Sequence, residues 1–142
     1  MKKLFVFIVF SCLMIACKKT SVPNYENIGI PDGCYMGRLN YKGINYWAEI
    51  CFDKNKYEEW PSGGAAFQKS YGCLTIGTFS ISKNMLTFKP DTWKFKNFPE
   101  PCVPDMILPG DYLIKGMMNN DSLIFEKGSD NSRIIYYLKK TH

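Results

Sequence analysis

The stretch GCYMGRLNYKGINYWAEICFD, residues 33–53, constrains the fold more than any other part of this sequence. Lys42 and Gly43 suit a two-residue hairpin turn, in which a glycine supplies a positive φ. A turn there pairs residues whose numbers sum to 85, and a slip of one residue would move every side chain to the opposite face. One face of the predicted antiparallel hairpin then holds Tyr35, Gly37, Leu39 and Tyr41 opposite Ile50, Ala48, Tyr46 and Ile44.

Further β-rich runs follow the hairpin, and most of them are joined by short turns. They cover residues 56–60, 73–82, 85–90, 111–118, 122–127 and 133–140. Apart from the N-terminal segment, no run has a convincing helical period. We therefore predict an all-β domain of about eight strands, with little helix beyond the N-terminal segment. The most economical closure of such a meander is an antiparallel up-and-down β-barrel.

The N-terminus has the pattern of an export signal. A short positive start at 1–3 precedes about a dozen mostly apolar residues at 4–15, whereas a helix needs about 20 to cross a bilayer core of ~30 Å. The sequence MIAC at 14–17 resembles the lipobox of bacterial lipoproteins, which ends in a small residue and a cysteine. This resemblance implies cleavage after Ala16 and lipidation of Cys17 with diacylglycerol and a further acyl chain such as palmitate. The alternative is an ordinary secretory signal followed by an incidental cysteine.

The chain is predicted to have three parts: a signal peptide at 1–16, a lipidated tether at 17–31, and a barrel domain at 32–142. The tether is expected because 18–31 is polar, contains proline and glycine, and has no sustained periodicity. The formal charge is +5 and falls to +3 when the two lysines at the start are removed with the signal. This charge is too small to indicate a nucleic-acid partner.

Six cysteines are present, of which one leaves with the signal peptide and one is the lipid site. The hairpin register places Cys34 opposite Cys51 as a non-hydrogen-bonded pair, whose Cα atoms lie about 4.5 Å apart and within disulfide range. Cys73 and Cys102 then form a second disulfide by elimination. A zinc site is the alternative, but there is no C-x-x-C pair and the only histidine is the terminal His142.

The domain resembles the small lipocalin-like barrel lipoproteins of bacterial envelopes. The resemblance covers residues 33–140 and rests on the segments GCYMGRLNYKG, GTFSISKNMLTF, LPGDYLIKGMMNNDSLIF and IIYYLKK. It implies a lipocalin-like barrel. Because these motifs are structural and not catalytic, the resemblance implies little about activity.

No group of residues forms a convincing catalytic set. The single histidine is the last residue of the chain, so a Ser-His or Cys-His pair is not expected. Glu58 and Glu59 point to opposite faces of a strand and are predicted to be solvated, not paired for acid–base chemistry. We therefore expect a protein that is not an enzyme and that binds no cofactor or metal. The scattered methionines are expected to pack and not to bind copper: Met36, Met85, Met106, Met117 and Met118.

Aromatic residues supply the candidate binding surface and the candidate interior. Trp93, Phe95 and Phe98 alternate with lysines in the segment 89–98, which fits either a strand at the barrel rim or a binding surface. So many large side chains favour a filled or narrow barrel over an open cup. The candidate interior positions are Tyr35, Tyr41, Tyr46, Phe52, Phe79, Phe88, Tyr112, Phe125 and Tyr137.

The predicted function is that of a non-enzymatic cell-envelope lipoprotein whose barrel binds a small apolar ligand or an envelope component. The alternative is an inhibitor or immunity-type lipoprotein that neutralises a periplasmic toxin or hydrolase by binding it. A connected apolar cavity of about 300 Å³ or more would favour the small ligand. A filled barrel with an exposed aromatic patch at the 61–72 or 92–108 loops would favour a protein partner.

The predicted partner at the N-terminus is the membrane itself, reached through the lipid on Cys17. Lipoproteins exported to the cell surface often carry an acidic cluster after the lipidated cysteine, but this chain has Lys-Lys-Thr-Ser at 18–21. We therefore expect the protein at the outer membrane, facing the periplasm, with exposure on the cell surface as the alternative.

Overall fold

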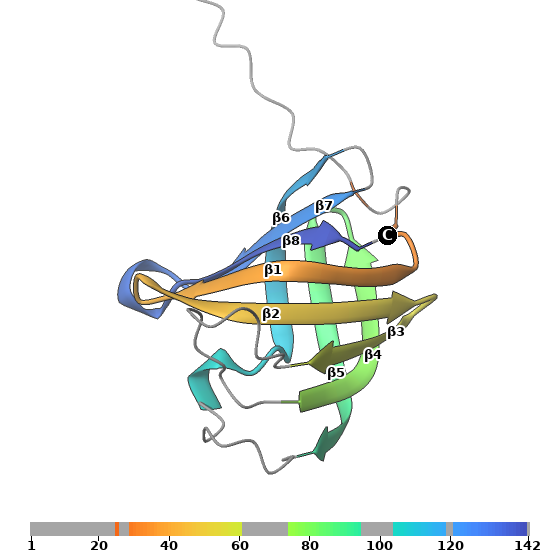
Figure 1. The fold of residues 1–142 in the computed structure, drawn as a ribbon, viewed down its shortest axis with the longest axis horizontal. Coiled ribbons are helices and arrows are strands. Elements are labelled where there is room, and N and C mark those ends of the chain that lie inside the picture. Colours follow the sequence, from red (N-terminus) through yellow and green to blue (C-terminus); the bar gives the residue numbers. More distant parts are fainter. Residues whose placement is uncertain (1–24, 26–28, 61–73, 95–103, 119–120, 142) are drawn as a thin grey trace, which may run out of the picture.

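The structure, a computed structural model, describes residues 25, 29–60, 74–94, 104–118 and 121–141, with the backbone alone at 92–94 and 118. In this part of the chain, antiparallel strands close into one barrel in which each strand pairs with the next and the last pairs with the first (Figure 1). The strands are β1 (Gly33–Tyr41), β2 (Ile44–Asp53), β3 (Lys56–Trp60), β4 (Leu74–Ser82), β5 (Met85–Lys94), β6 (Gly110–Met118), β7 (Ser122–Lys127) and β8 (Ile134–Lys140). The predicted closed eight-stranded antiparallel barrel is confirmed, and it is consistent with a lipocalin-like domain.

The first hairpin has the predicted register. Lys42 and Gly43 have φ angles of 52° and 77°, as a two-residue turn between twisted strands requires. Tyr41 pairs with Ile44, and every earlier residue of β1 pairs as predicted from that turn. The later strands also follow the predicted runs, although β5 extends past the predicted end to Lys94. Period-two alternation and turn chemistry are therefore sufficient to define most strands of this barrel.

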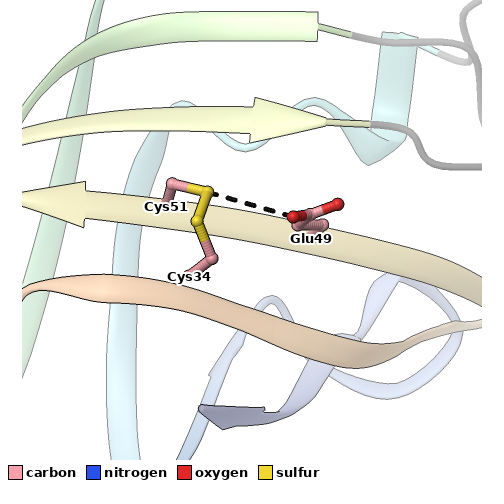
Figure 2. Close-up of side chains that lie close together, drawn as sticks. All are labelled: Cys34, Glu49 and Cys51. Carbon is pink, nitrogen blue, oxygen red and sulfur yellow. Dashed lines mark hydrogen bonds between the residues drawn. A yellow bond between two sulfur atoms is a disulfide. The ribbon is translucent and has the colours of Figure 1, made fainter. Parts of the chain in front are cut away.

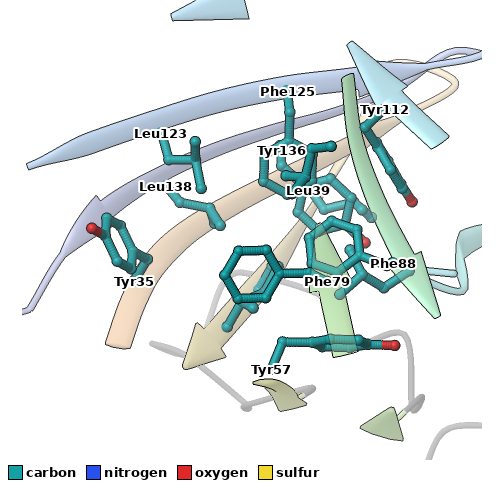
Figure 3. Packing of buried hydrophobic residues seen from close by; sticks show 14 of the residues in the cluster. Tyr35, Leu39, Tyr57, Phe79, Phe88, Tyr112, Leu123, Phe125, Tyr136 and Leu138 are labelled. Carbon is teal, nitrogen blue, oxygen red and sulfur yellow. The ribbon is translucent and has the colours of Figure 1, made fainter. Parts of the chain in front are cut away.

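Aromatic side chains fill the described interior (Figure 3). Phe88 lies at the centre, with its ring centroid 4.9 Å from that of Tyr57 and 5.7 Å from those of Tyr112 and Phe125. The rings continue in edge-to-face and stacked contacts toward both ends of the barrel. Such rings exclude water and contribute both burial and specific geometry to stability. The described residues thus form a filled interior, as predicted.

Segments outside the strands pack over the two ends of the barrel. We call the end where β1 begins the N-terminal end, and the end where the turn 42–43 lies the turn end. At the N-terminal end, Tyr25 and Ile30 are buried in the core, and the Tyr25 N–H donates to the Lys83 carbonyl at 2.8 Å. At the turn end, the 3₁₀ helix η1 (Pro104–Met106) leads into Leu108, which is fully buried. A second 3₁₀ helix, η2 (Asp130–Ser132), precedes β8.

Three expectations about burial need correction or refinement. Tyr137 faces outward, because β8 buries Ile134, Tyr136 and Leu138 on its inward face, and Tyr136 takes the predicted interior place. Tyr46 is only partly buried, although it packs against the core. The buried Tyr25 and Ile30 belong to the packed domain although they fall within the predicted tether 17–31. The described residues include no helix with the length and hydrophobicity of a membrane span.

Candidate binding sites

The predicted disulfide joins Cys34 to Cys51 on the outer face of the first hairpin (Figure 2). The two Cα atoms are 3.9 Å apart across the strand pair. The Glu49 carboxylate lies beside the bond, with its Oε1 atom 4.0 Å from the Cys51 sulfur. Because the two sulfurs are bonded to each other, this cluster offers no thiolate to a metal ion.

Several predicted site residues lie outside the described part of the chain. They are Cys17, Cys73, Phe95, Phe98 and Cys102. The backbone of Trp93 is described, and it pairs with Thr75 in the β4–β5 ladder. The lipid site, the second disulfide and the Trp93–Phe98 surface therefore stay predictions.

A groove of about 420 Å³ lies on the outer face of the barrel, over β1, β2, β7 and β8. Arg38 pairs with Trp47 on one side and with Tyr137 on the other, so these three side chains point outward together. The Arg38 guanidinium stacks over the Tyr137 ring, 4.5 Å from its centroid. The principal lining side chains are Met36, Arg38, Trp47, Ile124, Tyr137 and Lys139.

Gly37 shapes the floor of this outer groove. A Cβ atom at this position would lie 1.9 Å from the Tyr137 carbonyl oxygen, a distance that no side chain tolerates. Glycine therefore lets β1 approach β8 closely, as glycines in barrel strands commonly do. The lining contains the cations Arg38 and Lys139 and no acidic side chain. The outer groove thus combines partly exposed aromatic side chains with positive charge.

The second site is a cluster of polar side chains inside the barrel, near the turn end. We call it the polar site, and it consists of Tyr57, Glu59, Thr75, Tyr112 and Tyr136. Glu59 is fully buried, because alternation along the short strand β3 places it on the same inward face as Tyr57. Its carboxylate accepts hydrogen bonds from the Thr75 hydroxyl at 2.9 Å and the Tyr136 hydroxyl at 3.1 Å. These bonds offset part of the cost of burying a charge.

Two further hydroxyl groups of the polar site are buried without a hydrogen-bond partner of acceptable geometry, those of Tyr57 and Tyr112. Burial raises the pKa of Tyr57 to about 12 and the negative charge of Glu59 adds to this, although the nearby Thr75 hydroxyl acts in the opposite direction. Burial likewise raises the pKa of Tyr112. Both phenols are therefore neutral at physiological pH and can donate as well as accept a hydrogen bond.

Lys127 lies at the boundary between the polar site and solvent. Its Nζ atom donates to the carbonyl oxygens of Ile107 at 2.8 Å and Pro109 at 3.1 Å, and it lies 4.8 Å from the ring centroid of Tyr112. Burial lowers the pKa of Lys127, whereas the charge of Glu59 raises it. The same lysine lines an open pocket of about 530 Å³ at the turn end, together with Tyr41 and other residues.

The polar site is the feature that the sequence reasoning missed. Glu58 and Glu59 point to opposite faces as predicted, but only Glu58 is partly exposed, and the prediction that Glu59 is solvated is wrong. The signal was present, since an inward Tyr57 requires the residue two positions later to face inward as well. Tyr136 was missed for the same kind of reason, because its neighbour Tyr137 was assigned to the interior.

Comparison with known proteins adds no relative to this description. No protein-family model, no curated protein and no solved structure matches the chain. Its candidate functions therefore rest on the outer groove and the polar site themselves.

Proposed function

We propose that this chain is a lipid-anchored protein of the bacterial cell envelope that acts by binding a partner protein at its outer groove, and not by catalysis. The observation that carries the proposal is the combination of a ring-filled interior with an outer groove in which Trp47 and Tyr137 are partly exposed beside the exposed Arg38. Of the two functions expected from the sequence, it favours the protein-binding, inhibitor or immunity-type role over a cup for a small apolar ligand.

The interior supports this choice because its central volume is occupied by side chains. Phe52 contacts Phe79 with centroids 5.0 Å apart, and the Phe125 ring stacks on Tyr136 at 4.7 Å. An apolar ligand of drug-like size needs a pocket of roughly 300 Å³ or more. Side chains of this packed core would have to leave their positions to admit one.

The outer groove supports a protein partner through its residue types. Tryptophan, tyrosine and arginine are the side chains that most often dominate the binding energy of protein interfaces. Arg38 and Lys139 make the groove positive, so the complementary partner is a segment with apolar side chains flanked by carboxylates. The nearest acid on β1 or β2, Glu49, lies opposite Met36 at one edge of this surface.

The envelope location rests on the N-terminal resemblance to lipoprotein signals. Under this proposal Cys17 carries the lipid and the barrel faces the periplasm. Replacement of Cys17 by serine is expected to abolish metabolic labelling with radioactive palmitate, whereas Cys12→Ser is expected to leave it unchanged. Labelling that persists in Cys17→Ser would overturn the anchor.

Site-specific photocrosslinking in the native envelope tests the binding surface. The photoreactive residue p-benzoylphenylalanine is placed at Trp47 in the groove or, as the control, at Lys89, an exposed position on β5. We expect a discrete protein adduct from position 47 alone, and its loss when Arg38→Glu is added. A lipid adduct, a dimer of this chain, equal adducts from both positions, or no adduct from either would contradict the proposal.

A further inference from the structure

The polar site combines features that a merely structural core does not need. The hydrogen-bonded Glu59 carboxylate is buried among aromatic rings together with two hydroxyl groups that lack a partner, those of Tyr57 and Tyr112, although apolar residues at the same positions would avoid this cost. In Figure 3 the hydroxyl groups of Tyr57 and Tyr112 lie on the same side of the ring cluster, whereas that of Tyr35 lies on the opposite side. Glu59 lies toward the turn end as well, because its carboxylate accepts from Thr75 and Tyr136, which are near the starts of β4 and β8.

Aromatic rings surround these polar groups. The Tyr112 centroid lies 5.8 Å from that of Tyr136, and both Tyr57 and Tyr112 contact Phe88 edge to face. A carboxylate among aromatic rings attracts organic cations, because the ring faces and the carboxylate both carry negative potential. The chemistry of the polar site therefore fits a positively charged nitrogen group.

The protein itself places such a group at the edge of the polar site. Lys127 continues the inward face of β7 that holds Leu123 and Phe125, and its ammonium packs over the Tyr112 ring. Two of its N–H groups donate to the Ile107 and Pro109 carbonyls. A primary ammonium ion can make these same donor contacts, whereas a quaternary ammonium ion has no N–H to donate.

We propose that the polar site and the open pocket beside it form one binding site for a small primary ammonium compound, and that Lys127 occupies the ammonium position until the ligand displaces it. The ligand's N–H groups bond to the carbonyls that now accept from Lys127. Its charge is stabilised by Glu59 and the Tyr112 ring, and its remaining polar atoms bond to the Tyr57 and Tyr112 hydroxyls. The displaced lysine moves into the pocket lined by Asp105. This site is separate from the outer groove and does not depend on it.

Isothermal titration of the purified full-length protein with n-butylammonium tests the proposal. We expect Lys127→Ala to bind this probe at least tenfold more tightly than the wild-type protein, because the competing ammonium is gone. The matched control is Lys115→Ala, since Lys115 is exposed on the outer face of β6 and ion-pairs with Glu126. Tetramethylammonium and n-butanol, which lack either the N–H donors or the charge, are expected to bind Lys127→Ala at least tenfold more weakly than butylammonium does.

The role of Glu59 is tested in the Lys127→Ala protein. Glu59→Gln added to Lys127→Ala should reduce butylammonium affinity at least tenfold. Tyr57→Phe, which removes only an unpartnered hydroxyl, should reduce severalfold the affinity for 4-hydroxybutylammonium, whose hydroxyl can bond to Tyr57, and should leave butylammonium affinity unchanged. If the Glu59→Gln protein fails to fold by circular dichroism, the Tyr57→Phe result decides. Equal affinity in the Lys127→Ala and Lys115→Ala proteins, equal binding of the three probes, or no binding at all would overturn the proposal. A negative result here leaves crosslinking at the outer groove unaffected.

Discussion

The two ends of the barrel interior are built by the same alternation of side chains but hold different chemistry. At the N-terminal end, Phe52 packs edge to face against Tyr35 and Phe79, with Tyr25 and Ile30 buried nearby. Toward the turn end, the inward positions hold the Glu59 carboxylate, the hydroxyls of Thr75, Tyr112 and Tyr136, and the Lys127 ammonium, whereas the backbone of Tyr57 pairs with that of Phe52. Apolar burial therefore stabilises the N-terminal end, whereas at the turn end the burial of polar groups offsets part of that stabilisation.

This difference distinguishes residues that stabilise the fold from residues whose presence the fold does not require. Sequences whose local choices all agree with the fold are stable, and the exceptions are expected at functional sites. The polar site is such an exception, because nothing about closing the barrel requires a charge inside it. The outer groove differs again, since its aromatic residues are partly exposed and contribute little to the core.

Replacement of Phe52 by alanine is expected to have the largest effect. Phe52 is 3% exposed and contacts rings on three sides, so a cavity would remain. We expect a loss of about 3–5 kcal/mol in the free energy of unfolding, measured by urea denaturation with circular dichroism. The conservative Phe52→Leu should lose less than half as much. A loss below about 1 kcal/mol for the alanine variant would mean that the N-terminal end is not the stabilising part.

Removal of the Cys34–Cys51 disulfide comes next. The bond closes a loop with a sequence separation of 17 residues, for which the chain-entropy account gives about 3 kcal/mol. We expect the double serine variant to unfold at lower urea concentration by this amount while keeping its β-type spectrum. Peptide mapping without reduction should find Cys34 joined to Cys51 in the wild-type protein. A different partner for either cysteine would contradict the register of the first hairpin.

Tyr136→Phe tests whether the polar site is internally bonded. The variant removes the hydroxyl that donates to Glu59 at 3.1 Å and keeps the ring that stacks on Phe125. Because hydrogen bonds to charged groups are the stronger ones, we expect a loss of about 1.5–3 kcal/mol in the free energy of unfolding. An unchanged stability would indicate that the Tyr136–Glu59 bond contributes nothing to the fold.

Tyr57→Phe provides the matched contrast and the smallest effect. Its hydroxyl has no partner to lose, so stability at neutral pH should change by less than about 0.5 kcal/mol. The stabilities of the wild-type protein and of Tyr57→Phe are expected to differ at alkaline pH. With the folded pKa raised to about 12 from 10.0, the stability that the neutral phenol contributes is complete below pH 10 and is lost as the pH rises toward 12. The stability of the wild-type protein should therefore fall more steeply over that range than that of Tyr57→Phe, and parallel curves would refute this assignment.

Much of the barrel was predictable because turns and alternation are local. The turn at Lys42 and Gly43 defines the first register and, with it, the Cys34–Cys51 pair. In IIYYLKK at 134–140, the inward face is either Ile134, Tyr136 and Leu138 or Ile135, Tyr137 and Lys139. Each set contains one isoleucine and one tyrosine, so only the difference between Leu138 and Lys139 shows which set faces inward. Weighing that last pair would have assigned Tyr136 to the interior.

The polar site was less predictable for a physical reason. A glutamate on a short strand is usually solvated, and only the packing of β4 and β8 around β3 supplies the hydroxyl donors that allow Glu59 to be buried. Thr75 and Tyr136 are distant from Glu59 in sequence, with separations of 16 and 77 residues. The burial of Tyr25 likewise depends on contact with a remote turn at Lys83, which local patterns do not encode.

Under the proposed lipid anchor at Cys17, the burial of Tyr25 in the barrel limits how far the protein reaches from the bilayer. If Cys17 is held at the membrane surface, the chain from it to Tyr25 spans at most about 28 Å when fully extended, at ~3.5 Å per residue. The N-terminal end of the barrel then stays close to the lipid head groups. A partner that docks in the outer groove has to approach within the same narrow layer, which favours other membrane-attached proteins over freely diffusing ones.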